Sequence, residues 1–179
     1  MRPDPDQPMH DPALRQLRLL TRYNAWANAR LYEALATLPS GELAAPRNPE
    51  ASSMLSVLGH AWVVDRIWQA HLEGRAHGHS SRQAEGDLVL SSLRQAQAQL
   101  DGWYVACADG LDAARLEEVV HFRFVDGGAG AMRRGDIVLH VVNHKTYHRG
   151  YVADMLYQAG RRPPVMDLPV FLRDVPQPV

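Results

Sequence analysis

Apolar residues recur every three or four positions over four long stretches of this chain, and this spacing predicts amphipathic helices. The first stretch covers residues 12–38, and one polar residue, Asn24, interrupts its inner stripe. The second begins at a serine that can cap a helix, Ser52 or Ser53, and runs to Gly74. Glycine tolerates the left-handed conformation that often ends a helix, so the second stretch has a plausible start and end.

Two further helices and a hairpin complete the pattern. A loop of glycine, histidine and serine residues, 74–86, leads to a third helix with an apolar stripe from Leu93 to Cys107. Over residues 118–134 the period changes to strict alternation around a glycine-rich turn, which predicts a short β-hairpin. The fourth helix covers about residues 136–159, and the proline-containing tail, 161–179, is predicted to be extended coil. The chain is therefore expected to be mainly all-α, with a small hairpin before the fourth helix.

Size and composition limit the possible partners. A chain of 179 residues fits one domain, which we expect over residues 12–179, with residues 1–11 as a flexible tail. A formal net charge of −1 gives no basic face for nucleic acid or an anionic membrane, so the expected partner is a small molecule. One cysteine, Cys107, permits no disulfide framework, and no apolar leader or membrane-spanning stretch is present, which predicts a cytoplasmic protein.

Three histidines, His60, His144 and His148, lie in the middle of otherwise aliphatic stripes on the second and fourth helices. His144 and His148 are four residues apart and project from the same side of a helix, although nine histidines would produce roughly 0.4 such pairs by chance. A buried imidazole without a partner costs about 1–3 kcal/mol, so three facing one interior need a common explanation. A divalent metal ion with one open coordination position provides it, and zinc, nickel and iron all accept imidazole.

Spacing alone leaves alternatives open. Each histidine could instead be a core residue bonded to a backbone carbonyl, and His140 forms a second pair of the same spacing with His144. Four others lie near loops or on the alternating segment and are expected at the surface: His71, His77, His79 and His121. Lys145 and Arg149 lie off the inner stripe and are expected in solvent or, for Arg149, near an anionic substrate.

Familiar catalytic motifs are absent from the sequence. The residue after His144 is Lys145 rather than the glutamate of a His-Glu-x-x-His protease, and there is no nucleophile elbow, phosphate-binding loop or dinucleotide fingerprint. No carboxylate lies on the inner stripes of the second or fourth helix, so a general base for hydrolysis is missing. Cys107 is expected to be a small core residue.

Several segments together resemble the DinB/YfiT-like metalloproteins. The segment 139–150, which contains both His144 and His148, looks like the fourth-helix signature of that family, and Tyr23-Asn-Ala-Trp-Ala-Asn28 looks like its first-helix motif. Residues 58–60, 65–68 and 72–74 are similar to its second helix, and residues 162–164 and 167–173 to its tail. The likeness covers most of residues 14–173 and is weakest in the third helix.

The resemblance implies a four-helix bundle with up-up-down-down connectivity, often a homodimer, that holds one divalent metal ion through His60, His144 and His148. It thereby selects against His140. From the imidazole ligands we expect this ion to be zinc or nickel, with iron as a further option. For some relatives the resemblance also implies a low-molecular-weight thiol as cofactor. The function expected is a metal-dependent enzyme such as a thiol-dependent S-transferase or isomerase. The alternatives are a metal-dependent hydrolase and a non-catalytic metal-binding module that dimerises.

Overall fold

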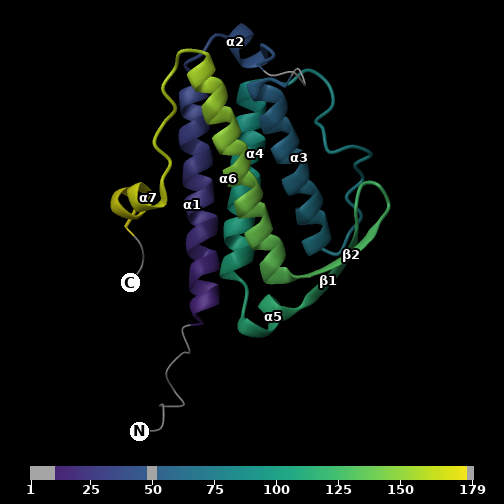
Figure 1. Ribbon diagram of the computed structural model, residues 1–179. Helices are drawn as coiled ribbons and strands as arrows, with labels where there is room; N and C mark the ends of the chain where they lie inside the picture. Colours follow the sequence, from purple (N-terminus) through teal and green to yellow (C-terminus); the bar gives the residue numbers. More distant parts are fainter. Residues whose placement is uncertain (1–10, 48–51, 177–179) are drawn as a thin grey trace.

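The computed structural model describes residues 11–47 and 52–176, so all of the flexible tail expected at residues 1–11 except Asp11 lies outside the described residues. Four long helices form the body of the molecule (Figure 1): α1 (Pro12–Leu35), α3 (Met54–Leu72), α4 (Leu90–Asp109) and α6 (Arg134–Gln158). Shorter elements connect and flank them: α2 (Ser40–Ala44), α5 (Ala113–Glu117), α7 (Leu168–Asp174), β1 (Val119–Arg123) and β2 (Ala129–Arg133). The predicted mainly helical fold is confirmed.

Local sequence signals explain where these helices begin and end. The carboxylate of Asp11 accepts the N–H of Ala13 at 2.8 Å and so caps α1. At α3 the side chain of Ser53 accepts the N–H of Ser56, and the Ser56 hydroxyl accepts the N–H of Ser53 in return. Gly74, which follows α3, adopts the left-handed conformation with φ 70°. Sequence therefore predicted the bounds of α3 well, whereas α1 ends at Leu35 rather than at residue 38.

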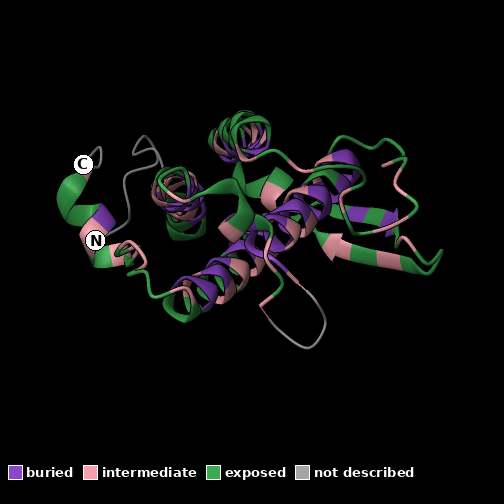
Figure 2. Cartoon of the chain, turned by 90° about the horizontal axis from the view of Figure 1, so that it is seen from above, coloured by how far each residue is buried: buried purple, intermediate pink, exposed green. Residues whose placement is uncertain are grey.

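The predicted hairpin is confirmed, but the prediction for the tail is wrong in part. β1 and β2 pair antiparallel, and β1 alternates between exposed and buried residues (Figure 2). In the tail, Leu168–Asp174 forms the helix α7 where extended coil was expected. Pro169 occupies an early helical position, where its missing N–H is not needed. Phe171 then packs its ring 5.9 Å from Tyr23 and 5.5 Å from Trp26, measured between centroids.

Two apolar clusters show how the helices are oriented. One joins the start of α1 and of α6 to the ends of α3 and α4, and the other joins the opposite ends of the same four helices. Helices α1 and α6 therefore run in one direction, and α3 and α4 run in the other (Figure 1). This is an up-down-down-up order, so the up-up-down-down connectivity that the resemblance implied is wrong. Because α3 and α4 run in the same direction, the segment 73–89 has to return along the length of α3 before α4 begins.

Between the two clusters lies a layer of buried polar side chains contributed by all four long helices. Its members, called here the buried polar layer, are Asn24 and Asn28 of α1, Asp65 of α3, Gln97 and Asp101 of α4, and Lys145 and Arg149 of α6. Two carboxylates and two cationic groups give the layer balanced formal charge. Balance and hydrogen bonding are what make such burial tolerable, since an isolated ion inside a protein is very costly.

Each member of the layer bonds to another helix. The ammonium of Lys145 lies 2.9 Å from the Asp65 carboxylate and donates to the Gln97 side chain at 2.9 Å. Arg149 donates to Asn28 at 2.9 Å, and Asn28 donates in turn to Asp101 at 3.0 Å. Lys145 and Arg149 are each only 3% exposed, so the expectation that they lie in solvent is wrong. Opposite charges on α3 and α4 explain the difference.

The pair formed by Asp65 and Lys145 can be tested by removing one charge. We expect Lys145→Met to lower the free energy of unfolding by about 3–5 kcal/mol, because Asp65 is left buried and uncompensated. Urea denaturation measures this change. The double variant Asp65→Asn/Lys145→Met, which removes both charges, should lose much less than the sum of the two single variants. A loss below about 1 kcal/mol for Lys145→Met would contradict a tightly packed ion pair.

Candidate metal centre

The structure brings His60, His144 and His148 together. His60 projects from the middle of α3, and His144 and His148 project one turn apart from α6, which packs beside α3. One ring nitrogen from each of the three lies within 4.8 Å of the other two. The Nε2 atoms of His144 and His148 are 3.0 Å apart. Within residues 11–47 and 52–176, these three histidines form the one group of three or more histidine, cysteine or acidic residues that is close enough to hold a metal ion.

A backbone hydrogen bond sets the protonation of His60. Its Nδ1 lies 2.9 Å from the carbonyl oxygen of Arg82, which can only accept, so Nδ1 carries the proton. Nε2 is then left with a lone pair, as a metal ligand requires. The segment that supplies this carbonyl runs very close to α3. A Cβ on Gly59 would meet a methyl carbon of Leu88 at 2.7 Å and the Cβ of Ala84 at 3.0 Å, so those side chains would have to shift.

Burial and mutual repulsion keep the imidazoles of α6 neutral. Desolvation, reinforced by the nearby His148 and His60, lowers the pKa of His144 to about 3. Desolvation and His60 lower the pKa of His148 to about 4. The pKa of His60 is also lowered by burial, although its bond to the Arg82 carbonyl opposes the shift. At neutral pH the site therefore offers uncharged nitrogen donors, which is the state that binds metal ions.

The donor set fits a divalent ion. At 3.0 Å the two Nε2 atoms either share a hydrogen bond, with one of them carrying the proton, or both direct lone pairs at one cation. The Nδ1 atoms of His144 and His148 are buried and have no hydrogen-bond partner among the described residues. Three imidazoles are the ligands expected for zinc, nickel or iron. The three-histidine cluster could therefore hold a metal ion.

A pocket of about 480 Å³ opens beside the cluster. It is called here the triad pocket, and His60 and His144 form part of its wall. Its other lining residues come from α3, the α3–α4 connection, the hairpin turn and α6: Val64, Ile67, Trp68, His71, Ser80, Arg82, Phe124, Val125, Asp126 and His140. Because two of the three histidines border open space, a small molecule could approach an ion held by them.

The remaining histidines differ in their surroundings. His140 lies outside the three-histidine group, stacks on His144 with ring centroids 5.7 Å apart, and faces the triad pocket. His71 is 8% exposed and packs against Trp68 and Phe122, so the expectation of a surface position is wrong for this residue. His121 is exposed, as expected.

Sequence reasoning missed one carboxylate. Asp65 lies on α3, the helix from which an interior acid was excluded, and is fully buried. It was overlooked because it follows Val64 of the inner stripe by one residue and so lies at the edge of that stripe. Its Oδ2 is held by Lys145 and Gln97, and it does not line the triad pocket, so it does not supply the missing base.

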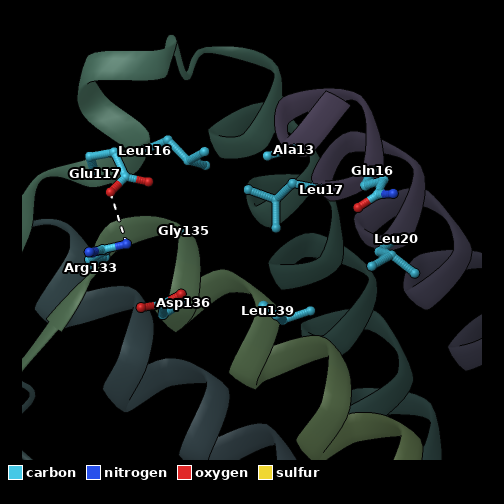
Figure 3. Close-up of a pocket in the computed structure, with 10 residues that line it drawn as sticks. All are labelled: Ala13, Gln16, Leu17, Leu20, Leu116, Glu117, Arg133, Gly135, Asp136 and Leu139. Carbon is cyan, nitrogen blue, oxygen red and sulfur yellow. Dashed lines mark ion pairs between the residues drawn. The ribbon is translucent and has the colours of Figure 1, made fainter. Parts of the chain in front are cut away.

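A second, smaller hollow of about 210 Å³ lies between the starts of α1 and α6 and the end of α5 (Figure 3). Leu17, Leu20, Leu116 and Leu139 line it, and an ion pair between Glu117 and Arg133, 3.0 Å long, lies at its edge. Its ten lining residues include no histidine or cysteine. The triad pocket is therefore the better candidate for chemistry.

These features define a helical bundle with a three-histidine site open to a pocket. A sequence model of the DinB family matches residues 9–177, so the chain belongs to the DinB family. Among curated proteins it is similar to "Protein DinB" of Bacillus subtilis (strain 168), with 24% identity over 146 residues that cover 79% of this chain and 84% of the relative. Across residues 11–47 and 52–176, we find no helix whose length and hydropathy would let it cross a bilayer.

Metal analysis of the purified protein tests the site directly. We expect about one divalent ion per chain, because one three-histidine cluster is present among the described residues. His144→Ala should lose most of this metal. His140→Ala is the matched control, since His140 neighbours His144 on α6 but lies outside the cluster, and it should keep its metal. Full occupancy in His144→Ala would show that the ligands are other residues.

The lowered pKa values predict how the metal-free protein responds to acid. Because the pKa of His144 is about 3 and that of His148 about 4 in the folded state, against about 6.5 when unfolded, the unfolded chain binds more protons between these values. Protonation of these two residues therefore leaves the free energy of unfolding unchanged above about pH 6.5 and lowers it progressively as the pH drops toward 4.

Comparison with a variant isolates this effect. Burial raises the pKa of Asp101 to about 6, which acts in the opposite direction over part of the same range. The double variant His144→Gln/His148→Gln keeps Asp101, so the effect of Asp101 cancels in the comparison. The free energy of unfolding of chelator-treated parent and variant is measured by urea denaturation at several pH values between 7 and 4. The parent should lose stability relative to the variant as the pH falls. Parallel curves would show that the two imidazoles titrate normally.

Proposed function

We propose that this protein is a divalent-metal-dependent enzyme in which His60, His144 and His148 are the metal ligands and the triad pocket binds a small-molecule substrate. The observation that carries the proposal is the position of the histidine cluster, half-buried yet bordering a pocket of about 480 Å³. A purely structural ion is usually enclosed by four protein ligands, whereas three ligands beside open space suit a catalytic ion.

Within this class we favour a thiol-dependent transferase or isomerase that uses zinc or nickel. A metal ion bound here would lower the pKa of a coordinated thiol and so supply a thiolate at neutral pH. The chain's own residues prepare the site for this. The Arg82 carbonyl orients His60, burial keeps the rings neutral, and Val64, Ile67 and Trp68 exclude water from one wall of the pocket.

A hydrolase is the second candidate, and one observation favours it. Asp126, in the hairpin turn, lines the triad pocket and could act as the carboxylate base that hydrolysis requires. Its Oδ1 accepts the N–H of Gly128 at 3.1 Å, which fixes it in the turn, while its other carboxylate oxygen is available. We rank this candidate lower because Asp126 is exposed in the hairpin turn, where solvent competes for its carboxylate.

A homodimer is part of the proposal. Leu139, Tyr147 and Tyr157 are large side chains with apolar surface on α6, and 49%, 70% and 62% of their surfaces are exposed. They recur along the helix at spacings of eight and ten residues. Burial of such a surface against a second copy would support the non-catalytic alternative as well as the enzyme, so dimerisation does not distinguish them.

Turnover assays separate the three functions. Metal-loaded protein is incubated with low-molecular-weight thiols and electrophiles, and in parallel with esters and amides. We expect thiol-dependent consumption of an electrophile that His144→Ala abolishes and that Arg133→Gln, a change outside the triad pocket, preserves. Hydrolysis without thiol that is lost in Asp126→Asn would favour the hydrolase instead. Metal binding without turnover on either panel would leave the non-catalytic module.

A further inference from the structure

A third hollow, of about 610 Å³, adjoins the triad pocket and has no role in the proposal above. It lies between the loop that follows α3 and the β-hairpin, and it is called here the hairpin pocket. Six of its lining side chains carry its chemistry: His71, Arg75, His77, His121, Phe122 and Arg123. His71 lines both hollows, so the hairpin pocket meets the space beside the metal ligands at this side chain.

The hairpin pocket has cationic side chains on its wall and no carboxylate among its lining residues. Arg75 lies on one side and pairs through Nε with Glu73, which lies outside the lining. Arg123 lies on the other side and donates one N–H to the carbonyl of Gly127 at 3.2 Å. No ion pair joins Arg123 to a carboxylate within the described part of the chain, so its charge is uncompensated there. A guanidinium has five N–H donors, and most of those on Arg123 remain available.

The protonation of His77 adds a donor and argues against a second metal site. Its Nδ1 accepts the backbone N–H of His79 at 3.0 Å, so a neutral His77 carries its proton on Nε2. An N–H group at that position can bind an anion but cannot bind a cation. The ring of His71 lies 5.4 Å from that of His77 and 5.2 Å from that of Phe122, between centroids, so an aromatic wall adjoins the donors.

We propose that the hairpin pocket binds the anionic group, a carboxylate or a phosphate, of a small organic molecule whose apolar part lies across His71 toward the triad pocket. This inference rests on the proposed function, because the molecule is taken to be the substrate and its reacting end to lie beside His60 and His144. Arg123 is the main anion ligand, since arginine pairs with planar or tetrahedral oxyanions through two N–H groups. His77 and Arg75 supply further donors, and Trp68 and Phe122 contact the apolar part.

Isothermal titration of the metal-loaded protein with matched probes tests the anion site. The probes are 4-phenylbutyrate, its uncharged amide 4-phenylbutyramide, and phenyl phosphate. We expect at least one of the two anions to bind about tenfold more tightly than the amide, and the tighter of the two identifies the preferred oxyanion. Arg123→Gln should remove this preference. Arg133→Gln, which removes the same charge from the other strand of the hairpin outside the pocket, should retain it.

The same titration on His144→Ala distinguishes the two proposals. If Arg123 holds the anion, the preference persists in this variant even when the metal has been lost. A preference that survives in Arg123→Gln but disappears in His144→Ala would assign the anion to the metal ion and overturn the hairpin-pocket site. Equal affinity for acid and amide, or no binding of any probe at millimolar concentration, would overturn it too. Failure of the metal centre itself is detected separately by metal analysis of the parent protein.

Discussion

The two carboxylates and two cationic side chains of the buried polar layer determine how the four long helices are rotated relative to one another. The most direct link is between Asp65 of α3 and Lys145 of α6, the two helices that carry the histidine cluster. Because Lys145 immediately follows His144, its bond to Asp65 fixes how α6 is rotated against α3, and so fixes the direction in which His144 projects. A buried ion pair of this kind contributes little net stability compared with an apolar contact of the same size, so its main effect here is on register.

Two neighbouring faces of α6 contact different parts of the molecule, one the histidine site and the other the buried polar layer. His140, His144 and His148 recur every four residues and border the triad pocket or the histidine cluster. Lys145 and Arg149 are displaced from them by one residue and enter the buried polar layer. The positive charge of Lys145 lies close enough to contribute to the low pKa of both His144 and His148. The layer that orders the bundle therefore also helps to keep the imidazoles unprotonated.

Much of this arrangement follows from local sequence, and the remainder depends on distant contacts. Helical periodicity and capping residues predicted α3 and α6 and gave His60, His144 and His148 as candidates, whereas the choice of His148 over His140 came from the family resemblance. The pattern did not show that Lys145 and Arg149 are buried, since charged residues are normally solvated unless a partner compensates them. Their partners Gln97 and Asn28 are 48 and 121 residues away in the chain. The relative directions of the four helices could not be predicted either, because periodicity identifies the inner face of a helix but not the helices that pack against it.

The contact between His60 and the Arg82 carbonyl has a consequence for how sites of this type diversify. A hydrogen bond to the remote ring nitrogen increases the electron density that an imidazole can offer through its other nitrogen. Here that bond comes from an irregular connection of the chain and not from a neighbouring helix. Insertions or deletions in this connection would thus change the basicity of His60 while every histidine stayed in place, and with it the affinity for any metal ion that the cluster could hold.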